Sequence, residues 1–404
     1  MNLEHVYAVM SVLAGIVFLY TLVAKRIENS VISGPIVYVG LGLLLGEKGF
    51  GIISGSIEGN DLRPFADLTL ALILFSDAAH SNLRVLKEKA IYPARMLLLG
   101  LPGAIIVGFL LAVVIFDVLS VIEAAILATM LAATDAALGK AVISNPKVPA
   151  PVREGLNVES GLNDGLCVPI LLLLISIATS SADTEIGVSH GIMVFAEELG
   201  IGMLVGLSLA YVGAKLLYWS AKIAWLSEVW GQLTVGAIAL CSFGLAQTLH
   251  GSGYIAAFTG GLLFGHLVSR HTHRLVLATE SIAELLAMLT WILFGAAVVG
   301  RILGLFSANM VVYSLLSLSV VRMLPIYLSF SKTDVPAKHR LFMGWFGPRG
   351  LASIVFTIIV LDAELPGAKF IALAVTCTVI LSLILHGVSA RFLAERMGKD
   401  EPDS

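Results

Sequence analysis

The chain alternates between long apolar stretches and short polar connections along its whole length. Many of the apolar stretches approach the roughly 20 residues that a helix needs to cross a bilayer. Dividing the sequence at its polar connections predicts thirteen membrane-spanning helices. They cover residues 5–24, 31–47, 64–82, 94–116, 119–141, 154–179, 190–214, 228–247, 253–269, 278–300, 306–329, 341–362 and 367–395. We therefore expect an all-α polytopic membrane protein, with a single transmembrane domain over residues 1–397 and a short cytoplasmic tail at 398–404.

The composition agrees with a protein that lies in lipid. Of the 404 residues, 58% are hydrophobic and 13% are charged, whereas soluble domains carry about 25% charged residues. The net charge of −3 gives no indication of a nucleic-acid partner. The three cysteines fall in apolar spans without metal-ligand spacing, and the chain shows no phosphate loop, zinc spacing or nucleophile elbow. We expect no enzymatic activity and no cofactor.

The basic residues predict an orientation, because lysine and arginine concentrate in cytoplasmic loops. With the N-terminus outside, nineteen of the 25 lysines and arginines fall in inner connections or the C-terminal segment, and four fall in outer connections. The remaining two, Arg322 and Arg349, lie inside spans. We expect a multi-pass protein of the cell membrane with its N-terminus outside and its C-terminus in the cytoplasm.

Polar residues interrupt the apolar pattern at membrane depth, where ionisable groups are costly and mark pathways or paired helices. The four places are "ATDAALG" at 133–139, "ESGLNDG" at 159–165, Arg322 near Pro325, and "FGPRGL" at 346–351. The proline and glycines of "FGPRGL" predict an interrupted helix. Thr134 and Asp135 are a weaker signal of a second interruption. These two spans run in opposite directions, which suits inverted repeats with a midplane binding site; a proline kink for packing is the alternative.

The acids of "ESGLNDG" point in different directions on a helix. At about 100° per residue, Ser160 and Asp164 share a face, whereas Glu159 and Asp164 lie about 140° apart. Together with the aspartate of "ATDAALG" they make three acids against two intramembrane arginines. We expect Glu159 to pair with Arg322 or Arg349, the choice being open, and Asp164 to face a cavity. If the acids served only in structural ion pairs, the role of Glu159 would be explained, but one of the three acids would have no arginine to pair with.

A further acid precedes this region in "LFSDAAH", where Asp77 is a candidate accessory residue of the site. His80 follows within the same stretch, but no second histidine is nearby, so a resident metal ion is not expected.

Taken together, these motifs resemble the monovalent cation/proton antiporters, in particular the prokaryotic sodium/proton exchanger branch. The resemblance implies two inverted five-helix repeats arranged as a core domain and a dimerisation domain, and a homodimer. It also implies that Asp164 binds the transported alkali cation and the proton in turn. Thr134, Asp135 and Ser160 would be further ligands of the cation. Asn163 would belong to the same cation- and proton-binding site and would tie Glu159 to it.

The resemblance further implies exchange of one cation for one proton in pH homeostasis, because Asn163 stands where electrogenic relatives carry a second aspartate. Burial disfavours a charged carboxylate, so we expect a proton and a cation to compete for Asp164. Na⁺ or Li⁺ is the expected substrate, K⁺ the alternative, and a channel is disfavoured because the acids form no ring. Two positions depart from the pattern: Gly161 replaces a common leucine, and the acid near Ser76 is shifted to Asp77.

Overall fold

The computed structural model describes residues 3–28, 30, 33–53, 59–80, 91–143, 145–179, 185–268, 272–302 and 304–398. Within these residues, each of the thirteen predicted spans corresponds to one helix or to a helix interrupted part-way. The predicted tail from residue 399 onward lies outside the described residues.

The uninterrupted helices show the apolar composition that the hydropathy pattern predicts. They are α1 (Leu3–Glu28), α2 (Gly34–Leu45), α3 (Gly59–His80), α9 (Ala150–Thr179), α10 (Glu185–Lys222), α11 (Glu228–Thr248), α12 (Gly253–Leu267) and α19 (Ala368–Gly398). Two further spans contain a π-helical turn: α5 (Ile91–Arg95), η1 (Met96–Gly100) and α6 (Leu101–Ile115) form one, and α13 (Thr272–Leu293), η2 (Phe294–Val299) and α14 (Gly300–Ile302) form the other.

Three spans are broken into two helices each. They are α7 (Val121–Met130) with α8 (Ala136–Ile143), α15 (Ala308–Leu318) with α16 (Val320–Ser329), and α17 (Ala337–Trp345) with α18 (Leu351–Asp362). The first and third breaks coincide with "ATDAALG" and "FGPRGL", as expected. The break at Ser319 is not foreseen by the sequence reading. There the Ser319 hydroxyl bonds back to the carbonyl of Leu315 at 2.5 Å, a contact that bends helices.

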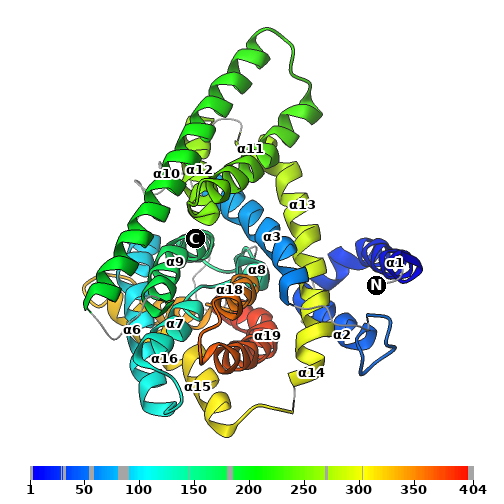
Figure 1. The fold of residues 1–404 in the computed structure, drawn as a ribbon. Coiled ribbons are helices and arrows are strands. Elements are labelled where there is room, and N and C mark those ends of the chain that lie inside the picture. The colour runs from blue at the N-terminus through cyan, green and yellow to red at the C-terminus, as the bar shows by residue number, and fades with distance from the viewer. Residues whose placement is uncertain are drawn as a thin grey trace.

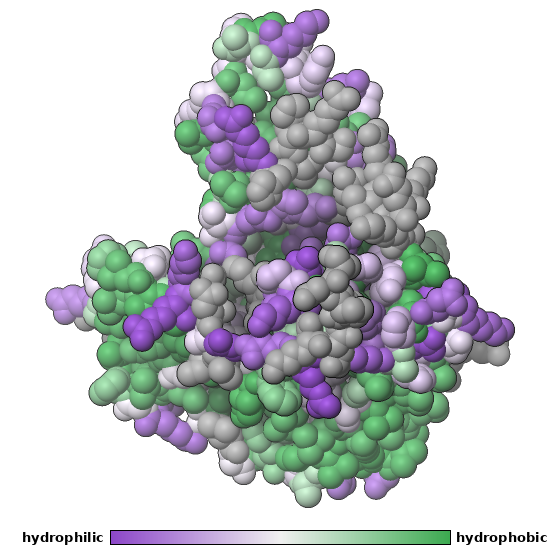
Figure 2. All heavy atoms as spheres, turned by 180° about the vertical axis from the view of Figure 1, so that it is seen from behind, coloured by the Kyte–Doolittle hydropathy of each residue, from purple (hydrophilic) through white to green (hydrophobic). Residues whose placement is uncertain are grey.

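By composition and length, eight of the described helical stretches can each cross a membrane, and four shorter apolar helices accompany them. Two of the short ones, α7 and α18, are halves of interrupted spans, which explains their length. Figure 2 shows broad hydrophobic surface on the flanks and lower part of the molecule, and hydrophilic residues gathered around a hollow near its middle. Such a distribution fits a protein surrounded by lipid with a polar entrance on one face.

The helices pack in two groups. One contains α2, α3 and α10–α13, in which α12 lies against α3 and α10. The other contains α5–α9 and α15–α19, and Figure 1 shows it as the dense cluster beside the lower part of α10. In this second group α7 packs against α6 and α9. α15 packs against α16 and α19, which in turn contact α17 and α18, respectively. The two groups meet where α9 contacts α10, α3 and α12 and where α18 contacts α3. Arg63 of α3 forms an ion pair with Asp362 at the end of α18.

Candidate functional site

The two interrupted helices meet at their breaks. The chain leaves α7 after Met130 and re-enters α8 at Ala136, and it leaves α17 after Trp345 and re-enters α18 at Leu351. The extended segments are joined by a backbone hydrogen bond in which the N–H of Asp135 donates to the carbonyl of Pro348 at 2.8 Å. Proline and glycine keep the second segment out of helical geometry. At both breaks, backbone N–H and carbonyl groups are therefore released from helical hydrogen bonds, and they lie close to one another where the two segments meet.

Asp135 stabilises two helix N-termini at once. Its Oδ1 accepts a hydrogen bond from the N–H of Leu138 in α8 at 3.1 Å, and its Oδ2 accepts one from the N–H of Leu351 in α18 at 2.8 Å. The N-terminus of a helix carries partial positive charge, which favours an anion there. A Cβ at Gly350 would lie 1.9 Å from Oδ2, so only glycine permits this approach. Both oxygens of the Asp135 carboxylate are thus engaged by backbone donors.

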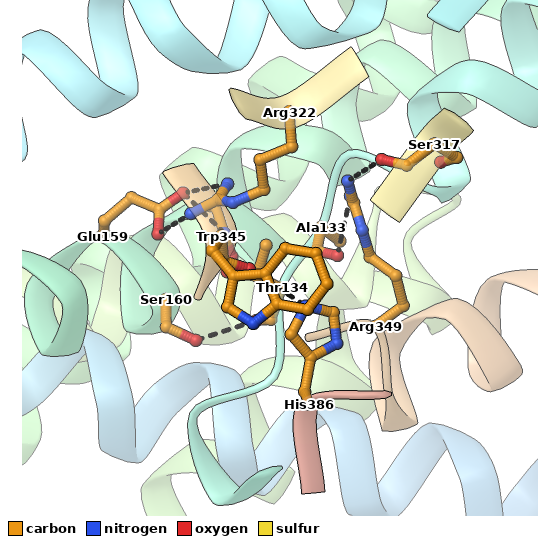
Figure 3. Close-up of polar contacts among 10 residues, drawn as sticks. Ala133, Thr134, Glu159, Ser160, Ser317, Arg322, Trp345, Arg349 and His386 are labelled. Atoms are coloured by element: carbon orange, nitrogen blue, oxygen red, sulfur yellow. Dashed lines mark hydrogen bonds and ion pairs between the residues drawn. The ribbon is translucent and has the colours of Figure 1, made fainter. Parts of the chain in front are cut away.

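Arg349 occupies the complementary position at helix C-termini. Its Nη1 donates to the carbonyl of Ala133 just beyond α7, and its Nη2 to the carbonyl of Ser317 in the last turn of α15, both at 3.4 Å. The side chain is fully buried. Because helix C-termini carry partial negative charge, the guanidinium is held by carbonyl dipoles, as Figure 3 shows.

Glu159 pairs with Arg322, which settles the choice that the sequence left open. Two hydrogen bonds of 2.9 Å run from Nη1 and Nη2 of Arg322 to the two carboxylate oxygens, and both side chains are buried. The amide of Asn163 donates to the hydroxyl of Thr134 at 2.5 Å and to Oε1 of Glu159 at 3.3 Å. A Cβ at Gly347 would fall 1.7 Å from Nε of Arg322. The pair therefore fixes α9, α16 and both breaks relative to one another.

Asp164 is the remaining acid of this cluster. It is 7% exposed, and within the described residues no hydrogen bond to its carboxylate is found. One turn earlier on α9, the Ser160 hydroxyl donates to the carbonyl of Thr134 at 2.9 Å, so a hydroxyl and a backbone carbonyl oxygen lie side by side there. Glu159 is matched by Arg322, whereas Asp164, the other acid of "ESGLNDG", has no hydrogen-bond partner among the described residues.

Asp77 lies on α3 opposite this part of α9. A Cβ at Gly161 would lie 3.4 Å from the Cβ of Asp77, and the carboxylate of Asp77 interacts electrostatically with those of Asp135 and Asp164. His80, one turn later, pairs with Glu280 of α13 at 3.0 Å. A leucine at the position of Gly161, which is common in the family, would press against Asp77. The glycine at 161 and the shifted acid at 77 are the two departures from the family pattern, and they therefore face each other.

Two residues of α19 support the "FGPRGL" break and were missed by the sequence reading. The backbone N–H of Arg349 donates to the hydroxyl of Ser382 at 2.7 Å. Ser382 in turn contacts Nδ1 of His386 at 3.0 Å, and Nε2 of His386 lies 2.9 Å from the carbonyl of Trp345. A neutral His386 with its proton on Nε2 satisfies both contacts, because Nε2–H donates to the carbonyl of Trp345 and Nδ1 accepts from the hydroxyl of Ser382. The available signal was a serine and a histidine four residues apart in an otherwise apolar span.

Comparison with known proteins agrees with this geometry. The sequence profile of the transmembrane sodium/hydrogen exchanger family matches residues 12–396. The chain belongs to the sodium/hydrogen exchanger family. It is therefore a multi-pass cation/proton antiporter, as the resemblance of its motifs implies.

Individual relatives cover almost the whole chain. The K⁺/H⁺ antiporter NhaP2 of Shewanella sp. (strain ANA-3) is 25% identical over 99% of this chain and 68% of its own length. The Na⁺/H⁺ antiporter ApNhaP of Aphanothece halophytica is 28% identical over 98% of this chain and 75% of its own length. The structure of the sodium proton antiporter MjNhaP1 from Methanocaldococcus jannaschii superposes with a TM-score of 0.79 and 21% identity, covering 98% of this chain and 100% of that one. The last likeness establishes the fold.

Proposed function

We propose that this antiporter exchanges one Na⁺ or Li⁺ for one H⁺ at Asp164. The observation that carries the proposal is the buried carboxylate of Asp164, which no described residue hydrogen-bonds. An intramembrane acid without a partner is costly, whereas one that always carries a proton or a cation is neutral.

The groups beside Asp164 suit an alkali cation. Hard cations prefer oxygen ligands such as carboxylates, hydroxyls and backbone carbonyls. Ser160 and Thr134 supply a hydroxyl and a carbonyl oxygen that are 2.9 Å apart, and Asp164 follows Ser160 by one helical turn. Asp135 contributes negative charge next to these ligands, while its oxygens also hold α8 and α18 in place.

The charge balance of the cluster supports a one-for-one exchange. Glu159 is neutralised by Arg322, and Asn163 is uncharged, so neither acts as a second proton carrier. The site on Asp164 then alternates between a protonated and a cation-bound form, both without net charge at that carboxyl group. We infer that α5–α9 and α15–α19 carry this site across the membrane relative to the group that contains α3 and α12, because an empty charged site would cost too much to move.

K⁺ is the second candidate substrate, since relatives of similar identity are named as K⁺/H⁺ and as Na⁺/H⁺ antiporters. We further propose that the protein is a homodimer of the cell membrane with its N-terminus outside, and that it serves pH homeostasis. The excess of basic residues in the inner connections supports this orientation.

Proton flux in proteoliposomes tests these proposals. Na⁺, Li⁺ and K⁺ are added in turn to liposomes that contain the parent protein, Asp164→Asn, or Asp117→Asn as a matched control, because Asp117 is exposed in the α6–α7 connection. We expect Na⁺ and Li⁺ to drive flux in the parent and the control but not in Asp164→Asn. A response to K⁺ alone would favour the second candidate, and retained flux in Asp164→Asn would refute the site.

A further inference from the structure

A cavity lies away from the ion site, between helix ends of the group that contains α2, α3 and α10–α13. The C-terminal end of α10, the N-terminus of α11, the C-terminus of α12 and the N-terminus of α13 enclose about 1000 Å³. Its walls are mainly apolar and include Leu217, Leu267 and Leu275. None of the residues that line it belongs to the site described above, so transport by Asp164 does not account for it.

The cavity is apolar inside and basic at its edge. Lys215, Tyr218 and Lys222 line it from α10 at a spacing of three and four residues, which places them on one helix face. Lys215 lies over the ring of Tyr211 at 5.6 Å. Within the described residues Lys222 has no hydrogen bond or ion pair.

Two positive charges remain unbalanced among the lining residues. Arg274 of α13 is paired with Glu228 at the start of α11, through a hydrogen bond of 2.9 Å from its Nε. This pair joins α13 to α11, and it neutralises Glu228, the acidic residue among those that line the cavity. The charges of the two lysines of α10 are therefore left for a ligand.

The position of the cavity matches the level of lipid headgroups. At 1.5 Å per residue, the 38 residues of α10 span about 57 Å, more than the roughly 30 Å of a hydrocarbon core. Its C-terminal end, at the top of Figure 1, projects beyond the other helices. Exposed aromatic residues surround this end: Trp219, Trp225 and Trp230. Such aromatic belts mark the boundary between membrane and water.

We propose that this cavity binds an anionic phospholipid, with the headgroup phosphate between Lys215 and Lys222 and an acyl chain along the leucine walls. A basic edge next to an apolar interior fits an amphipathic ligand, whose anionic headgroup contacts the lysines and whose acyl chain contacts the apolar walls. Basic pockets between membrane helices are known to select anionic headgroups. On the predicted orientation this end of α10 faces the cytoplasmic leaflet, which carries anionic lipids.

Tryptophan quenching tests the proposal, because three of the five tryptophans of the chain, Trp219, Trp225 and Trp230, each directly adjoin a cavity-lining residue in the sequence. The protein is reconstituted in phosphatidylcholine vesicles that contain increasing fractions of brominated phosphatidylglycerol or of brominated phosphatidylcholine. We expect phosphatidylglycerol to quench at lower fractions in the parent. Each basic side chain near headgroups contributes about a factor of five in affinity, so Lys215→Gln with Lys222→Gln reduces the preference by about 30-fold.

The matched control replaces Lys147 and Lys332 by glutamine, since both are exposed, lie on the same predicted side and do not line the cavity. It should keep the lipid preference of the parent. If the double variant does not fold, the single variant Lys222→Gln replaces it in the experiment. Its preference for phosphatidylglycerol should be about fivefold lower than that of the parent. Equal quenching by both lipids in the parent, or an equal loss in the control, overturns the proposal. A changed oligomeric mass of Lys222→Gln with unchanged lipid preference overturns it as well, because the face would then bind a second copy of the chain.

Discussion

Replacing Glu159 by glutamine removes the anion from the buried pair while keeping the shape of the side chain. The variant loses two charge-assisted hydrogen bonds of 2.9 Å to Arg322, whose side chain is 2% exposed. Removing one member of a buried pair typically costs about 3–5 kcal/mol, because the other charge is stranded. Nε of Arg322 already has no hydrogen-bond partner, so little compensation is available. We expect a clear loss of thermal stability with cation affinity close to that of the parent.

A double-mutant cycle separates the pair from other effects. Thermal unfolding of purified protein is measured for the parent, Glu159→Gln, Arg322→Gln and the double variant, and Na⁺ binding is measured by calorimetry on each. The double variant contains no stranded charge, so we expect it to be more stable than either single variant. Additive losses would show that the two side chains do not act as a pair. If Glu159→Gln unfolds like the parent but no longer binds Na⁺, the roles that we assign to Glu159 and Asp164 are reversed.

The remaining predictions concern the crossing of the interrupted helices. Asp164→Asn should abolish exchange in proteoliposomes while the melting temperature stays near that of the parent; a cation-driven flux would contradict this. Asp135→Asn should reduce exchange and also lower stability by about 1–3 kcal/mol, because an amide cannot accept from both backbone donors. An unchanged melting temperature would contradict the role of Asp135 at the N-termini of both α8 and α18. Gly350→Ala should disrupt the crossing, since its Cβ would meet Asp135 at 1.9 Å, whereas Gly139→Ala, with open space around it, should fold and melt at least as high as the parent.

The fold was readable from the sequence because lipid imposes a strong constraint: apolar runs of a given length must be helices. Each predicted span corresponds to a helical segment, and "FGPRGL" is broken where its proline and glycines indicate. The break at Ser319 could not be foreseen, because serine is common within membrane helices. It depends on a bond of the Ser319 hydroxyl back to Leu315, and on the donation from Arg349 to the carbonyl of Ser317.

The site was only partly predictable. Helical spacing separated Glu159 from Asp164, but it could not say which arginine faces Glu159, since this depends on how α9 and α16 are rotated against each other. The engagement of Asp135 with two helix N-termini was equally hidden, because it requires two breaks to coincide in space. Periodicity describes the faces of one helix, and these features belong to contacts between helices that are distant in sequence.

The most direct test of the central claim is the apparent cation affinity measured against pH, in proteoliposomes with equal pH on both sides. If one proton and one cation compete for Asp164, the affinity should weaken with falling pH by up to about tenfold per pH unit on the acidic flank. At high pH the exchange rate should also fall, because protons become scarce as the return substrate. An affinity that stays constant across the acidic flank, with only the maximal rate changing, would contradict competition at Asp164.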